Sequence, residues 1–182
     1  MRSFLSKRDF GYNRRAEAVE AARAEIRAAI AEVRDRNDLT DPKTRRWKEA
    51  VEAFNRALDR VYAEPLRQIA IGNKSPLEIE TAVILDFLEA DPIFFRSGYM
   101  KEKLLTELKR RKLQERERHR LQAIILTVVT KNDFRREFRR YCLVAPHVAD
   151  EAFKADLLEI QHSSAPNVSR RANWVLSALR KV

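Results

Sequence analysis

Arginine and lysine side chains gathered in one stretch are the groups of this sequence most suited to binding a ligand. Residues 101–140 hold 14 Lys and Arg against 6 Asp and Glu, while the whole chain of 182 residues carries a net charge of +10. Cations at this density bind polyanions, because they displace the counterions that surround phosphates. We therefore expect nucleic acid or an acidic protein surface as the partner. The residues expected to contact it are Lys109, Arg110, Arg111, Lys112, Arg116, Arg118, Arg120, Arg135, Arg136, Arg139 and Arg140.

The same clusters could instead be ordinary solvated helix faces. Residues 109–112 close a predicted helix, where the helix dipole favours cations. Residues 116–120 begin the next helix, where the dipole disfavours cations, and such a local conflict favours a functional surface. The arginines of residues 135–140 are predicted on the exposed side of a third helix, away from Phe134 and Phe138. No motif that reads bases is visible, so we expect contacts to the nucleic-acid backbone.

Residue types used in catalysis or metal binding form no recognisable pattern. The three histidines share no ligand spacing, and the single cysteine, Cys142, can form neither an internal disulfide nor a zinc site. With three glycines, the chain has no Gly-rich phosphate loop. Trp47 and Trp174 are interpreted as packing residues between helices. We therefore expect a protein without enzyme activity, metal or cofactor.

The elements that must position these side chains are predicted to be helices. Only three Gly and six Pro are present, and helix-favouring residues such as Ala, Arg and Leu are abundant. Apolar residues recur at three-to-four spacing over 14–36, and Asp41-Pro42 supplies a cap and a first-turn proline for a second such helix. We predict an all-α fold with a flexible basic and aromatic arm over residues 1–13, an αα-hairpin over 14–65, a connector over 66–75 and a helical-repeat domain over 76–182.

The second half of the sequence predicts about three antiparallel helix pairs. The apolar stripe changes direction between residues 108 and 121, so a turn is expected near 112–115. The second helices of the pairs are expected to begin near Gly98, Asn132 and Asn167, at intervals of 34 and 35 residues. A two-helix repeat of this length is typical of α-solenoids.

Residues 167–179 resemble the second helix of a HEAT repeat. That pattern has Val, then Ala four residues later, then an aliphatic residue, Leu and a later Leu. Here these residues are Val168, Ala172, Val175, Leu176 and Leu179. The sequence departs from the pattern at Ser169, where HEAT units usually carry Arg. The resemblance implies a short HEAT-like α-solenoid that serves as a scaffold for protein or nucleic-acid partners.

Together these patterns favour a non-catalytic basic helical scaffold that binds nucleic acid or a nucleoprotein through a Lys/Arg strip. The alternative is a protein–protein interaction adaptor that uses the hairpin and the solenoid surfaces, and an enzyme acting on nucleic acid is a third hypothesis. No apolar stretch approaches the ~20 residues of a membrane span. With one cysteine, the chain needs no oxidising compartment, so we expect a cytoplasmic location.

Overall fold

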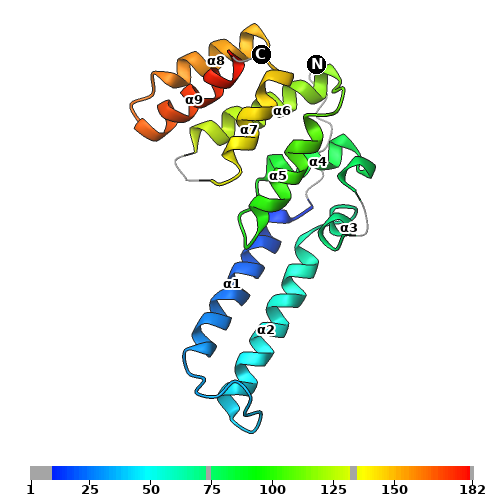
Figure 1. Ribbon diagram of the computed structural model, residues 1–182, viewed down its shortest axis with the longest axis vertical. Coiled ribbons are helices and arrows are strands. Elements are labelled where there is room, and N and C mark those ends of the chain that lie inside the picture. The colour runs from blue at the N-terminus through cyan, green and yellow to red at the C-terminus, as the bar shows by residue number, and fades with distance from the viewer. Residues whose placement is uncertain (1–9, 73–74, 132–134, 181–182) are drawn as a thin grey trace. The chain divides into compact units, whose positions relative to one another are not determined.

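The computed structural model describes residues 10–72, 75–131 and 135–180. These residues form helices and no strands, so the predicted all-α fold is confirmed (Figure 1). The chain divides into two compact units. The hairpin unit contains the described residues up to Ser75 together with residues 90–97, and the basic unit contains residues 76–89 and the described residues from 98 onward.

The hairpin unit is built on two long helices, α1 (Tyr12–Ile30) and α2 (Pro42–Val61), followed by the short α3 (Leu66–Ala70). α2 begins as predicted, because the Asp41 carboxylate accepts a hydrogen bond from the amide of Lys43 and Pro42 occupies the first turn. α1 ends six residues before the predicted Arg36. Local bonds replace the helix there: the carbonyl of Asp35 accepts from the buried Thr44 hydroxyl at 2.8 Å, and its carboxylate accepts from the amide of Asn37.

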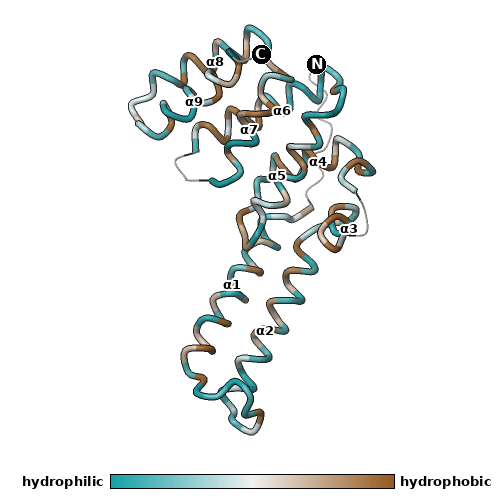
Figure 2. Tube along the Cα trace, in the orientation of Figure 1, coloured by the Kyte–Doolittle hydropathy of each residue, from teal (hydrophilic) through white to brown (hydrophobic). Residues whose placement is uncertain are grey.

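Burial in the hairpin unit is uneven. α1 buries Val19 fully, whereas α2 buries only Thr44 and Val61 along its 20 residues. Figure 2 shows hydrophobic and hydrophilic residues alternating along α1 and α2, as in amphipathic helices. Residues 90–97 return to this unit, where the ring of Phe95 lies against Phe54, its centroid 5.8 Å from that ring. The apolar stripe of α2 is therefore only partly covered.

The basic unit holds the remaining α-helices around one apolar core. Its largest fully buried side chains include Phe87, Tyr141 and Phe153. A turn separates two of the helices at the predicted place, and Gln114 and Glu117 form a capping box there. α8 and α9 pack side by side as an antiparallel pair (Figure 1). The helices are α4 (Thr81–Ala90), α5 (Ser97–Leu108), α6 (Glu115–Thr130), α7 (Phe138–Val144), α8 (Glu151–Gln161) and α9 (Pro166–Leu179), with short 3-10 turns at Pro76–Glu78 and Ala145–His147.

The helix expected to begin at Asn132 differs from the prediction. Residues 132–134 lie outside the described residues, and α7 begins only at Phe138, after a turn at Arg136 and Glu137. The starts of α5, α7 and α9 are consequently not evenly spaced along the chain. The solenoid repeat stays a prediction. No helix of the described residues is both long and apolar enough to cross a membrane.

Candidate nucleic-acid interface

Six of the predicted contact residues present their charges to solvent. All six are exposed, and within the described part of the chain their side chains take part in no hydrogen bond or ion pair. Such cations can approach a phosphate without first breaking an internal contact. They are Lys109, Arg110, Lys112, Arg116, Arg139 and Arg140.

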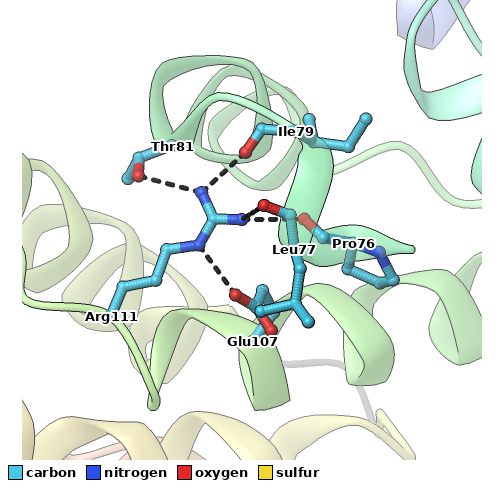
Figure 3. Close-up of polar contacts among 6 residues, drawn as sticks. All are labelled: Pro76, Leu77, Ile79, Thr81, Glu107 and Arg111. Carbon is cyan, nitrogen blue, oxygen red and sulfur yellow. Dashed lines mark hydrogen bonds and ion pairs between the residues drawn. The ribbon is translucent and has the colours of Figure 1, made fainter. Parts of the chain in front are cut away.

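Arg111 occupies a different environment, shown in Figure 3. Its Nη1 donates to the carbonyl of Ile79 at 2.6 Å, its Nη2 donates to the carbonyl of Pro76 at 2.7 Å, and its Nε lies 2.9 Å from Oε1 of Glu107. The hydroxyl of Thr81 also accepts from Nη1, at 3.1 Å. The guanidinium thus joins the end of α5 to the segment that leads into α4. The prediction that Arg111 contacts a partner is therefore corrected, because its guanidinium is already bonded within the basic unit.

Two further arginines of α6, Arg118 and Arg120, are partly buried in the basic unit. Nη2 of Arg120 lies 2.7 Å from Asp86 and 2.9 Å from Glu89, both on α4. These two carboxylates neutralise its charge. Arg118 is half-buried, and its Nε has no hydrogen-bond partner among the described residues. Both residues therefore contribute less to the surface charge than their place in the basic stretch predicts.

The expectation that Arg135 is exposed is wrong. Arg135 precedes α7 instead of lying on a helix, and it is 9% exposed. The neighbouring Arg136 is exposed, and its guanidinium lies 4.4 Å from the centroid of the Tyr99 ring. Nη1 of Arg136 donates to the Tyr99 hydroxyl at 2.8 Å, and its Nε pairs with Glu102 at 3.4 Å. These contacts join the turn before α7 to the first two turns of α5.

Sequence reasoning missed two aromatic residues beside these cations. Tyr99 is 48% exposed and Trp174 is 47% exposed, so the interpretation of Trp174 as a packing residue is only partly right. One edge of Trp174 packs on Phe138, with ring centroids 5.9 Å apart, and Arg170 lies 5.5 Å from the Trp174 centroid. The exposure of Trp174 could have been predicted from its angular position on α9. At about 100° per residue, Trp174 lies roughly 140° from the apolar stripe of its helix.

The exposed cations form two groups instead of one continuous strip. The α5–α6 cluster (Lys109, Arg110, Lys112 and Arg116) lies between the end of α5 and the start of α6. The α7 cluster (Arg136, Arg139 and Arg140) lies beside the start of α5, because Arg136 contacts Tyr99 there. The length of α5 therefore separates the two clusters by about 15–20 Å.

Comparison of this chain with protein-family models, with curated proteins and with solved structures gave no match.

Proposed function

We propose that this protein is a helical scaffold that binds nucleic acid through contacts to the phosphate backbone. The observation that carries the proposal is the set of six exposed cations that have no acidic partner in the described residues. An Arg or Lys that is already paired gains little from a phosphate, since it exchanges one anion for another. An unpaired exposed cation gains the full entropy of counterion release.

The spacing of the two clusters suits an extended polyanion. Phosphates follow one strand of nucleic acid about every 3.4 Å, so a separation of 15–20 Å corresponds to about five phosphates. One strand can therefore contact the α5–α6 cluster and the α7 cluster together. Contacts of this kind fix the position of the nucleic acid without reading its sequence.

A charge-reversal experiment tests the proposal. The double variant Arg139→Glu/Arg140→Glu and the double variant Lys109→Glu/Arg110→Glu should each weaken binding to a DNA oligonucleotide at least ten-fold, measured by fluorescence anisotropy, because each removes two phosphate contacts. The matched control is Arg27→Glu/Arg34→Glu, which makes the same change in net charge at two exposed positions of the hairpin unit. Equal losses in all three variants would show a response to net charge alone and would reject the interface.

The HEAT-like scaffold belongs to the same proposal. It is supported by the antiparallel packing of α8 on α9 and by the burial of Val168, Ala172, Val175 and Leu176, residues of the HEAT-like pattern. A cytoplasmic location, inferred from the single cysteine, is likewise proposed.

The hairpin unit favours a second candidate function, the binding of a protein partner. Trp47, Val51, Phe54 and Leu58 form the apolar stripe of α2, and all four stay partly exposed. An open groove of about 1050 Å³ is also lined by residues of α1, of α2 and of the segment that follows α2, mostly alanines and arginines. Raising the salt concentration should weaken the binding of such a protein partner less than it weakens the binding of a nucleic acid. This function would be favoured if Val51→Asp loses the binding of the protein partner while Arg139→Glu/Arg140→Glu keeps it.

A further inference from the structure

Two exposed aromatic residues each contact the short segment where α7 begins. Arg136 contacts Tyr99 of α5, and Phe138, two residues later, contacts Trp174 of α9. Tyr99 and Trp174 are nearly half exposed as residues, although aromatic side chains of this size bury a large apolar area when they pack in a core. The two residues therefore contact the same short segment of chain and are both accessible from outside.

Each ring is accompanied by an arginine. The guanidinium of Arg136 covers the Tyr99 ring at 4.4 Å, and that of Arg170 covers Trp174 at 5.5 Å. Both arginines are exposed, and each also makes a polar contact, Arg136 with Glu102 and the Tyr99 hydroxyl and Arg170 with Asn167. Exposed contacts of this kind contribute little stability, so a phosphate can replace them at a modest cost. Arg139 and Arg140 lie in the first turn of α7 and are exposed. The surface thus combines exposed aromatic rings with exposed cations.

We infer that this surface binds single-stranded nucleic acid, with bases stacked on Tyr99 and Trp174 and phosphates held by Arg136, Arg139, Arg140 and Arg170. The inference rests on the proposed function and adds the class of nucleic acid to it. Bases of a duplex are stacked on each other, so their faces are closed to a protein ring. Bases of a single strand offer those faces, and stacking on aromatic residues is tolerant of sequence.

The fluorescence of Trp174 provides a direct test that leaves the binding surface intact. The chain has two tryptophans, so the variant Trp47→Phe, changed in the hairpin unit, keeps Trp174 as its only indole. An oligothymidylate of about twelve nucleotides is a suitable probe, because it spans an ordinary single-strand binding site and adds no base pairing. Stacking predicts that its binding quenches the emission of Trp174, with the same dissociation constant that anisotropy gives. Binding without any change in emission would overturn the inference.

Affinity measurements on variants separate this inference from the proposed function. Tyr99→Leu and Trp174→Leu should each weaken oligothymidylate binding about ten-fold or more and leave the affinity for a duplex of the same length unchanged. Trp174→Phe, which keeps a ring, should recover most of the loss. Leu158→Ala, at an exposed apolar position of α8, is the matched control and should have no effect. Equal weakening for single strand and duplex, or no weakening for either, would reject stacking.

The charge variants report on the proposed function independently. If Arg139→Glu/Arg140→Glu weakens the binding of both nucleic acids while the aromatic variants bind normally, backbone binding stands and the stacking inference fails. If the charge variant binds both nucleic acids normally, the proposed function fails as well.

Discussion

The ammonium group of Lys101 lies 3.5 Å from Oε1 of Glu137 inside the basic unit, where their side chains are 1% and 8% exposed. Lys101 belongs to α5, and Glu137 immediately precedes α7. The pair therefore fixes the turn before α7 against α5. Arg136 and Phe138 are the neighbours of Glu137 in the chain, so the same pair positions the cation beside Tyr99 and the ring beneath Trp174.

Replacing Lys101 with Met should lower the free energy of unfolding by about 3–5 kcal/mol, because the carboxylate of Glu137 would stay buried without its partner. Lys103→Met removes the same charge from an exposed position of the same helix and should change stability by less than about 0.5 kcal/mol. Urea denaturation measures both values. A loss in Lys101→Met no larger than that of the control would contradict the assigned role of the pair.

Gly98 lies close to the Glu137 carboxylate of that ion pair, and it is expected to resist substitution. A Cβ added there would lie 2.9 Å from Oε2 of Glu137, whose carboxylate is held by Lys101. Overpacking costs about 1–3 kcal/mol, and the better helix propensity of Ala returns less than about 1 kcal/mol. Thermal unfolding of Gly98→Ala should therefore show a lower Tm than the unchanged protein. An equal or higher Tm would show that Glu137 can move aside.

The same substitution should lower stability at one of two adjacent arginines that follow α5 and weaken nucleic-acid binding at the other. Arg111→Gln should lower the free energy of unfolding by about 2–3 kcal/mol, because it removes the charged hydrogen bonds to Glu107 and to the carbonyls of Pro76 and Ile79. Arg110→Gln should leave stability unchanged and weaken nucleic-acid binding, because Arg110 is exposed. Denaturation and anisotropy on the two variants measure this contrast. A larger stability loss in Arg110→Gln would reverse the assignment.

The thiol of Cys142 should react slowly in the folded protein. Burial raises the pKa of Cys142 to about 11, whereas a cysteine in an unfolded chain titrates near 8.5. The reactive thiolate is therefore scarcer in the folded state at pH 8. Alkylation by iodoacetamide at that pH should be about a hundred-fold slower in buffer than in urea. Similar rates in the two solvents would show that the thiol is accessible and ionised in the fold.

The helices themselves were largely predictable from the sequence, because they follow from local rules. The Asp41-Pro42 start was predicted from capping residues, and the turn before Glu115 was predicted from the phase of the apolar stripe. Errors arose where side chains bond to the nearby backbone. Asp35 and Thr44 end α1 early in this way, and local propensity does not weigh such bonds against one more helical turn.

The candidate interface was predictable only in its charge. Composition located the basic stretch, but it could not separate Arg110, which is exposed, from Arg111, which bonds to residues more than 30 positions earlier. The partners of Arg111 depend on tertiary structure, and no spacing rule encodes them. The exposure of Trp174 could have been predicted, because its helical phase places it away from the apolar stripe. The role of Tyr99 could not be predicted, because its contact joins α5 to Arg136 in the turn before α7, 37 residues later.

The salt dependence of DNA binding tests the account most directly. If all six exposed cations contact phosphates of a duplex, the logarithm of the association constant should fall with the logarithm of salt concentration with a slope of about −5, and Arg139→Glu/Arg140→Glu should reduce that slope by about two. Anisotropy titrations between about 50 and 200 mM salt give both slopes. A slope near zero, or a slope that the double variant leaves unchanged, would contradict binding through these cations.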